Sequence, residues 1–252
     1  MKKLLWIYNI HKSFFVNFKE NKMKYKNIVK GKFLERPNRF ISYCEIDNNI
    51  EKVHVKNTGK CKELLIPNCV VYLEESDNPN RKTKYDLVAV EKGNLLINMD
   101  SNAPNKVVQE WLTSSGCSIL KENEQVFVKP EYKYKNSRFD FYVEDGTRKI
   151  FIEVKGVTLE EEGVVKFPDA PSERAVKHVE ELVEALNEGY ESYVIFVVQM
   201  KSIKYFTPNH DTQPQFAEAL KNAQLKGVKV LAYDCVVTED TLKLDQEVPV
   251  HL

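Results

Sequence analysis

Residues 138–155 read RFDFYVEDGTRKIFIEVK, a pattern that predicts a β-hairpin. Two runs of alternating apolar and polar residues flank Asp145-Gly146-Thr147, and an Asp-Gly pair between such runs is a strong signal for a tight β-hairpin. With Gly146 and Thr147 as the turn, Asp145 pairs with Arg148. A turn at Asp145-Gly146 would shift the pairing by two residues and leave the two faces unchanged.

The predicted register sorts the hairpin side chains onto two faces. One face is wholly apolar and consists of three facing pairs: Phe139 with Val154, Phe141 with Ile152, and Val143 with Ile150. On the other face Asp140 lies opposite Glu153, and Lys155 follows two residues on. Facing carboxylates repel, so this pair destabilises the hairpin unless positive charge lies between them.

Two interpretations of the acidic pair stay open at this point. In the first, the hairpin is exposed to solvent, and Lys155 and Arg138 neutralise both acids. In the second, Asp140 and Glu153 hold a divalent cation, Mg²⁺ or Mn²⁺, because carboxylate oxygens suit such ions. Lys155 would then orient a water or stabilise charge on a phosphorane, which is the chemistry of phosphodiester hydrolysis. Aspartate followed one strand later by Glu-x-Lys resembles the PD-(D/E)xK nuclease signature.

Patterns around the hairpin predict alternating helices and strands. In chain order we expect helix 103–115, strand 125–134, the hairpin, helix 175–186, strand 193–199, helix 215–226 and strand 228–236. A helix between strands implies a right-handed parallel crossover, so the sheet is expected to be mixed. The resulting α-β-β-β-α-β order resembles the core of the PD-(D/E)xK nucleases.

The first hundred residues have a different pattern. Short strand-like runs separated by turn residues occupy 40–46, 52–56, 69–74, 84–90 and 95–98. Five such strands indicate a small β-barrel of the oligonucleotide-binding (OB) type. The predicted fold class is therefore a small OB-like β-barrel followed by a nuclease-like α/β domain. The expected limits are a poorly ordered extension at 1–22, the barrel at 23–100 and the nuclease-like domain at 101–252.

Six segments together resemble one family. They are NTGKC (57–61), SDNPNRKTKYDLVAV (76–90), SRFDFYVED (137–145), FIEVKGVTL (151–159), FPDAPSERAVKHVEEL (167–182) and VIFVVQM (194–200). In this order they follow the pattern of the sugar fermentation stimulation protein A family. The resemblance implies non-specific DNA binding, an OB-like N-terminal domain and a nuclease-like C-terminal domain. Lys56 and Cys61 depart from the family pattern, in which relatives usually carry proline and methionine.

Charge becomes informative only when the chain is divided. The whole chain balances 37 Lys and Arg against 37 Asp and Glu, but residues 1–60 contain 14 basic and 5 acidic residues. A basic barrel beside an acidic second domain suggests that the barrel attracts phosphates. Residues 1–22 contribute part of that excess.

Several basic residues in or beside predicted turns, and at the start of the 175–186 helix, are candidates for DNA binding. They are Arg36, Arg39, Arg81, Lys82, Arg138, Arg174 and Lys177. For each of them, a solvated surface position is the alternative. DNA bound without sequence preference is the expected partner, together with a second copy of the chain in a homodimer.

Four other residues are candidates for accessory roles. Glu110 matches a position at which many such nucleases place an additional acid. Asp169 is expected to cap the following helix, with metal ligation as the alternative. His178 is expected at the surface or between domains rather than as a catalytic base. Gln199, at the end of a buried strand, either binds a phosphate or satisfies buried backbone.

Nothing in the sequence predicts export or membrane insertion. Polar residues interrupt the apolar part of residues 1–22, no small-residue cleavage site follows, and no other segment is a membrane span. The five cysteines are widely spaced and form no CxxC pair, which is typical of reduced thiols in a cytoplasmic protein.

Two functions from different classes remain. In the first, the protein is a magnesium-dependent nuclease with Asp140, Glu153 and Lys155 as its catalytic residues. In the second, it is a catalytically silent DNA-binding regulator linked to sugar (maltose) metabolism, and the nuclease-like domain is a scaffold. A sugar-metabolising enzyme is not supported, because no sugar site is visible.

Overall fold

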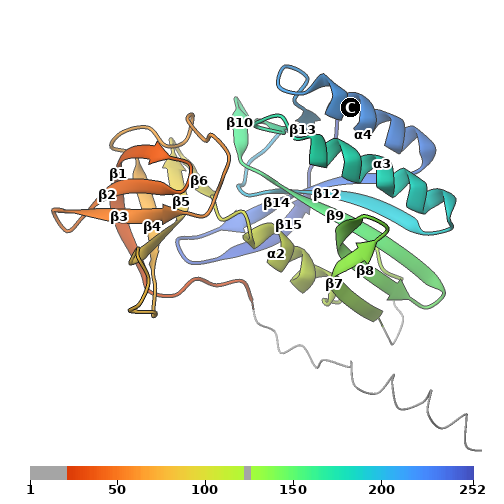
Figure 1. Cartoon of the computed structure of the whole chain (residues 1–252), viewed down its shortest axis with the longest axis horizontal. Helices are drawn as coiled ribbons and strands as arrows, with labels where there is room; N and C mark the ends of the chain where they lie inside the picture. Colours follow the sequence, from red (N-terminus) through yellow and green to blue (C-terminus); the bar gives the residue numbers. More distant parts are fainter. Residues whose placement is uncertain (1–21, 122–125) are drawn as a thin grey trace, which may run out of the picture.

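The computed structural model describes residues 22–121 and 126–252. The predicted extension at 1–22 therefore falls, except for its last residue, outside the described part of the chain. Figure 1 shows two bodies side by side, a β-barrel in orange and yellow and an α/β domain in green and blue. The predicted fold class is confirmed.

The first domain contains a six-stranded sheet. Its strands are β1 (Ile28–Asn38), β2 (Ile41–Ile46), β3 (Asn49–Val55), β4 (Val70–Glu75), β5 (Tyr85–Lys92) and β6 (Leu95–Asn98). Their order is β3-β2-β1-β4-β5-β6, and a parallel pairing of β3 with β5 closes the first five into a barrel. The sequence patterns missed β1, because only Gly31 and Phe33 of its eleven residues are buried and the strand lacks a clear apolar alternation.

The second domain has a mixed six-stranded sheet in the order β15-β14-β12-β9-β8-β7. Its strands are β7 (Val126–Tyr134), β8 (Ser137–Asp145), β9 (Arg148–Val157), β12 (Glu191–Val198), β14 (Lys229–Val237) and β15 (Leu242–Glu247). β12 is parallel to both β9 and β14, as the crossover rule predicts. A small sheet of β10 (Leu159–Glu161), β11 (Val164–Phe167) and β13 (Tyr205–Pro208) was not predicted.

Helices cover both faces of this sheet (Figure 1). α2 (Ala103–Leu112) packs through Val107 and Val108 into the cluster that contains Ile152, whereas α3 (Glu173–Asn187) and α4 (Pro214–Lys226) belong to the cluster with Phe151. Because successive strand residues point to opposite faces, α2 and the α3–α4 pair lie on opposite sides of β9. Both faces of the hairpin are therefore buried, which contradicts the first of the two interpretations, a hairpin exposed to solvent.

The hairpin register is confirmed over its distal part. Asp145 pairs with Arg148, Val143 with Ile150 and Phe141 with Ile152, around a turn in which Gly146 has φ +63°. The prediction for Phe139 is wrong, because its ring lies 5.0 Å from that of Phe151, on the face opposite to Phe141. The regular β8–β9 ladder ends at Phe141, and this break positions Asp140.

The two domains meet through buried polar groups. Gln199 bonds to Asn98 twice: its carbonyl accepts from the Asn98 backbone N–H at 2.9 Å, and its Nε2 donates to Asn98 Oδ1 at 2.8 Å. Lys92 at the end of β5 pairs with the Glu160 carboxylate of β10 at 2.6 Å. Along residues 22–121 and 126–252, no helix has the length and apolar character needed to span a membrane.

Candidate metal centre and nucleic-acid groove

Asp140 is held where the ladder between β8 and β9 stops. The Val154 backbone N–H donates to Asp140 Oδ2 at 2.7 Å, where a continued ladder would place a β8 carbonyl. Asn105, in the first turn of α2, donates from Nδ2 to Asp140 Oδ1 at 2.8 Å. The carboxylate is thus fixed from two elements.

Glu153 is buried on β9 and uses only one of its oxygens. Glu153 Oε1 is 2.6 Å from His178 Nδ1 and 2.5 Å from Lys155 Nζ. Glu153 Oε2 is buried and has no hydrogen-bond partner among the described residues. An unpartnered buried carboxylate oxygen is costly, so it is a sign of an unmet ligand or a functional strain.

The pKa values of the two acids are shifted in opposite directions. Burial and the neighbouring Glu153 charge raise the pKa of Asp140 to about 6. Burial also opposes ionisation of Glu153, but the bonds to His178 and Lys155 outweigh it and lower the Glu153 pKa below its usual value. Glu153 is therefore the permanent charge of the pair, and Asp140 is the one whose ionisation is resisted.

The pair meets the chemistry of a divalent-cation site in part. In the described part of the chain there is no cluster of three or more His, Cys, Asp and Glu side chains arranged for a metal ion. Two carboxylates, however, are a common protein contribution to Mg²⁺, which keeps several waters. The unpartnered Glu153 Oε2 and the resisted charge on Asp140 are both groups that a cation would stabilise. These two carboxylates are the side chains that would hold such an ion.

A groove of about 850 Å³ runs beside this centre, between the β7–β8 turn and the start of α3. Its basic lining comes from Lys133, Arg138, Arg174 and Lys177, and His178 forms part of its wall. Arg174 Nε donates to His178 Nε2 at 3.3 Å. Because a guanidinium only donates, His178 Nδ1 carries the proton that is shared with Glu153. The groove and the buried acid are therefore connected through one histidine.

Comparison with known proteins shows which family the chain belongs to. A family model described as "SfsA N-terminal OB domain" matches residues 34–99, and one described as "Sugar fermentation stimulation protein RE domain" matches residues 102–241. The chain belongs to the sugar fermentation stimulation protein (SfsA) family. Its predicted membership is thereby confirmed, while the predicted domain limits themselves stay predictions.

Relatives of this SfsA-family chain match it along most of its length. The "Sugar fermentation stimulation protein homolog" of Clostridium beijerinckii is 57% identical over 230 residues, which cover 91% of this chain and 100% of that protein. The homolog of Ruminiclostridium cellulolyticum is 57% identical over 234 residues, with the same coverage. The structure of Pyrococcus furiosus SfsA in complex with Ca²⁺ has a TM-score of 0.80 and 27% identity, and covers 91% of this chain and 98% of its own.

The arginines predicted to bind DNA from the barrel have structural partners. The Arg36 guanidinium donates to the backbone carbonyls of Arg39, Asn57, Gly59 and Lys60. Arg81 donates through both terminal nitrogens to the buried Asp86 carboxylate, at 2.9 and 2.6 Å. Arg39 and Lys82 are exposed. A DNA-binding role for these four residues stays a prediction.

The accessory candidates are scattered. Glu110 accepts a hydrogen bond from the Met23 backbone and is near the Lys106 charge. The α2 residue that bonds to Asp140 is Asn105. Ser172, not Asp169, caps α3, because its side chain accepts from the Ala175 N–H. The predicted cap was wrong, because α3 begins at Glu173 and Ser172, three residues after Asp169, occupies the N-cap position.

Gln199 bonds to Asn98 and to the Asp100 carbonyl at the domain junction, which agrees with the alternative that it satisfies buried backbone. His178 is buried and bonds to Glu153, contrary to the expectation of a surface or interdomain residue.

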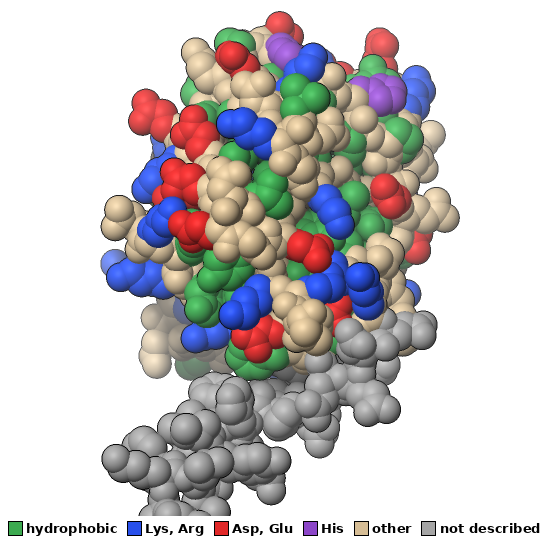
Figure 2. All heavy atoms as spheres, turned by 90° about the vertical axis from the view of Figure 1, so that its right-hand side faces the viewer, with side chains coloured by type: hydrophobic (Ala, Val, Ile, Leu, Met, Phe, Trp, Pro, Cys, Tyr) green, Lys and Arg blue, Asp and Glu red, His purple; other side chains and the backbone are tan. Residues whose placement is uncertain are grey.

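Two residues of the site had no sequence signal. Asn105 follows Pro104 at the start of α2, and nothing local distinguishes it from an ordinary exposed polar residue. Lys133 belongs to an edge strand rich in charge. Figure 2 views the right-hand end of the molecule and shows basic and acidic side chains intermixed on that face. Among the described residues, this face therefore has no broad basic surface that would indicate a DNA-binding groove.

Proposed function

We propose that this SfsA-family protein binds DNA without sequence preference and cleaves it at a divalent-cation-dependent centre of Asp140, Glu153 and Lys155. The observation that carries the proposal is the buried Glu153 Oε2, which has no partner among the described residues although Oε1 has two. A second support is the relative from Pyrococcus furiosus, whose structure was solved in complex with Ca²⁺.

Each residue has a separate task in this proposal. Asp140 and Glu153 would hold the cation, with Mg²⁺ or Mn²⁺ as the working ion. When bound, such an ion polarises a phosphoryl oxygen and lowers the pKa of a water molecule. Lys155, beside Glu153 at 2.5 Å, would orient the attacking water or stabilise the negative charge of the phosphorane. His178 and Asn105 would keep the two carboxylates in place, since each donates to one of them.

The groove supports the DNA-binding part of the proposal. Arg174 and Lys177 are exposed and lie one helical turn apart at the start of α3, and Arg138 faces them from β8. Basic side chains that line a groove attract the phosphate backbone without reading sequence. Arg138 is paired with the exposed Glu131 at 3.2 Å, a contact that an exposed pair can exchange at little cost.

One observation favours the catalytically silent alternative. Glu153 Oε1 is bonded by both His178 and Lys155, so the acid and the lysine partly neutralise each other within the fold. A scaffold that merely buries an ion pair would contain the same contacts. Such a protein would bind DNA and affect sugar metabolism through occupancy alone, in line with the family's name.

Cleavage assays separate the two functions. Single- and double-stranded DNA are incubated with the wild type, Lys155→Ala and Lys149→Ala, with and without Mg²⁺ or Mn²⁺. Lys149 lies on the same strand and is exposed, which makes it the matched control. We expect metal-dependent cleavage that falls about 100-fold or more in Lys155→Ala and stays unchanged in Lys149→Ala. Tight binding without cleavage under either metal would leave the silent regulator as the function.

A further inference from the structure

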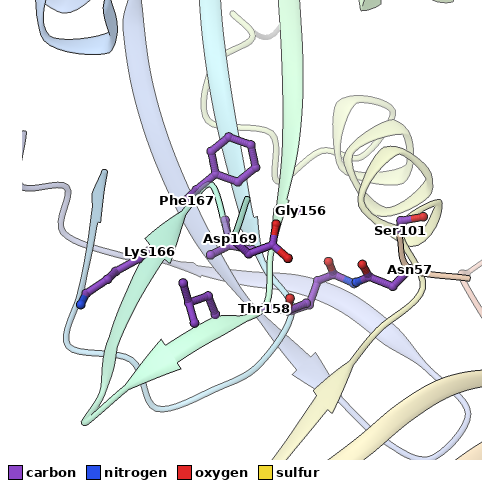
Figure 3. Close-up of a pocket in the computed structure, with 10 residues that line it drawn as sticks. Asn57, Ser101, Gly156, Thr158, Lys166, Phe167 and Asp169 are labelled. Carbon is purple, nitrogen blue, oxygen red and sulfur yellow. The ribbon is translucent and has the colours of Figure 1, made fainter. Parts of the chain in front are cut away.

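A second pocket, of about 110 Å³, lies where the barrel meets the α/β domain (Figure 3). Asn57 and Ser101 line one side, and Thr158, Asp169 and Gln199 line the other parts. The barrel loop closes tightly on this region, because a Cβ added to Gly59 would lie 2.1 Å from Asp169 Oδ2. Both domains are therefore needed to form the pocket.

The pocket adjoins the candidate metal centre along one strand. Side chains two residues apart on a strand share a face, so Glu153, Lys155 and Val157 point to the same side of β9. Val157 lines the pocket. At ~3.3 Å per residue, Val157 is roughly 13 Å along the strand from Glu153. A nucleotide whose phosphate lies at the acids can reach this pocket with its own base or that of a neighbour.

Several polar groups in the lining lack partners. Gln199 is only 1% exposed, and its Nε2 donates to Asn98 and Asp100, but its Oε1 has no hydrogen bond among the described residues. Gly156 leaves room for that oxygen, since a Cβ there would lie 2.6 Å from Gln199 Oε1. Asn57 Oδ1 accepts from the Gly59 N–H at 2.8 Å, and its Nδ2 is unused within the described residues.

Charge restricts what can enter. Asp169 brings a carboxylate towards the Asn57 side, whereas the Lys166 side chain extends away in Figure 3 and pairs with Glu161 at 2.6 Å. A phosphate group is therefore disfavoured inside the pocket. An occupant with an amine donor fits better, because Asp169 and Gln199 Oε1 accept hydrogen bonds while Asn57 and Thr158 can donate them.

Size and edge chemistry identify one class of ligand. At about 110 Å³ the pocket is smaller than a cavity of about 150 Å³ that binds benzene, so it excludes two fused rings and takes the edge of one six-membered ring. Cytosine presents an exocyclic amine that carboxylates accept, next to ring acceptors that amides satisfy. We infer that the pocket receives a pyrimidine base, cytosine in preference to thymine, from the strand bound at the metal centre. This inference rests on the proposed function.

A base can enter the pocket only when it is unpaired. The inference therefore includes a single-stranded or locally opened substrate at this point, since a base within a stacked duplex cannot expose its pairing edge. The sugar-phosphate chain would remain outside, near Lys155 and the basic groove. Phosphate contacts would supply most of the affinity, and the pocket would add a preference for one base.

Binding of short oligonucleotides tests this inference with the full chain in EDTA, where cleavage is prevented. Fluorescence anisotropy at fixed salt compares dC12, dT12 and dA12 for the wild type, Asp169→Asn and the exposed control Asp211→Asn. We expect dC12 to bind roughly tenfold more tightly than dT12, as one good base contact provides. Asp169→Asn should remove that difference and leave the affinity for dT12 unchanged, whereas Asp211→Asn should keep it.

Each other outcome is decisive. Equal binding of all three oligonucleotides would overturn the base pocket, which would then hold only water, and the proposed function would stand. A cytosine preference that survives both Asp169→Asn and Thr158→Val would place base reading elsewhere and also overturn it. If the wild type neither binds nor cleaves any DNA, the proposed function itself fails. Thermal melts of the variants exclude a loss of folding as the cause.

Discussion

Two aspartates, the buried Asp86 in the barrel and the half-buried Asp140 in the second domain, have pKa values shifted in opposite directions. Burial opposes the ionisation of both, but Arg81, His54 and Lys56 surround Asp86 in the barrel and lower its pKa to about 2. In the second domain Asp140 has Glu153 as its neighbour, and its pKa rises to about 6. The barrel surrounds Asp86 with cations, whereas the second domain compensates Glu153 but leaves Asp140 beside a like charge.

This difference separates structural charge from candidate functional charge. Strongly perturbed acids that resist ionisation cluster at functional sites, while a depressed pKa with a full set of partners is typical of a structural ion-pair network. The same contrast applies to the arginines. Both terminal nitrogens of Arg81 bind Asp86, whereas Arg174 and Lys177 are exposed in a groove and each has one longer contact, to His178 and Glu181 respectively. Net charge along the sequence pointed to the barrel, but two of its arginines, Arg36 and Arg81, are held by other groups of the fold.

Replacement of Arg81 by Ala is expected to have the largest effect on stability. Asp86 would stay buried but lose its bidentate partner, and this loss is expected to lower the unfolding free energy by about 3 kcal/mol. Urea unfolding at pH 7 measures it, with the exposed neighbour Lys82→Ala as the control, expected within about 0.5 kcal/mol of wild type. Unchanged stability together with weaker DNA binding would return Arg81 to the DNA interface.

Asp140→Asn should act in the opposite direction on the metal-free protein. The folded-state pKa of Asp140 lies above its unfolded value, so the folded form binds more protons, and stability falls as pH rises from about 4 to 6. Removing this charge is expected to raise the unfolding free energy by about 2 kcal/mol at pH 7, with little gain at pH 4.

Denaturant unfolding in EDTA at both pH values checks this, with Asp211→Asn, an exposed acid, as the control. A loss of stability at pH 7 would mean that the bonds from Val154 and Asn105 matter more than the repulsion by Glu153.

The smallest expected effect concerns the groove. Arg174→Ala combined with Lys177→Ala should reduce the slope of log K against log salt by about 2, since each phosphate contact contributes about 0.9. Lys221→Ala with Lys226→Ala is the matched control, because these exposed lysines lie on α4, whose end at Gly227 packs near Leu186 at the far end of α3. Equal slopes for both pairs would remove the groove from the interface.

The same salt titration applied to Arg39→Ala with Lys82→Ala sharpens the comparison of the two domains. A decrease similar to that of the groove pair would extend the DNA contact onto the barrel. An unchanged slope would confine it to the second domain.

Much of the fold could be predicted because its signals are local. The Asp-Gly turn set the register from Phe141 to Asp145, and the helix and strand between Glu173 and Val198 followed from periodicity. β1 and the small β10–β11–β13 sheet were missed, because strands that are half exposed or three to four residues long lack a readable alternation.

The candidate site divides in the same way. Asp140, Glu153 and Lys155 were predicted from their spacing on a hairpin. The predicted pairing of Asp140 with Glu153 was only partly right, because Asp140 lies beyond the end of the ladder and its Oδ2 accepts from the Val154 N–H. Asn105 bonds to Asp140, which lies 35 positions later in the chain, and His178 bonds to Glu153, which lies 25 positions earlier. No local pattern encodes such contacts.

By itself, the sequence determined the element order, the hairpin and the residue types available for chemistry, because turn preference and apolar periodicity act over a few residues. The tertiary structure determined which charged and polar groups have partners within the fold and which could bind a ligand. Arg36 and Arg81 are held by groups from other segments, Gln199 is turned towards a pocket between two domains, and Glu153 keeps one oxygen unpartnered among the described residues. Those outcomes depend on distances between residues far apart in the chain, which only folding sets.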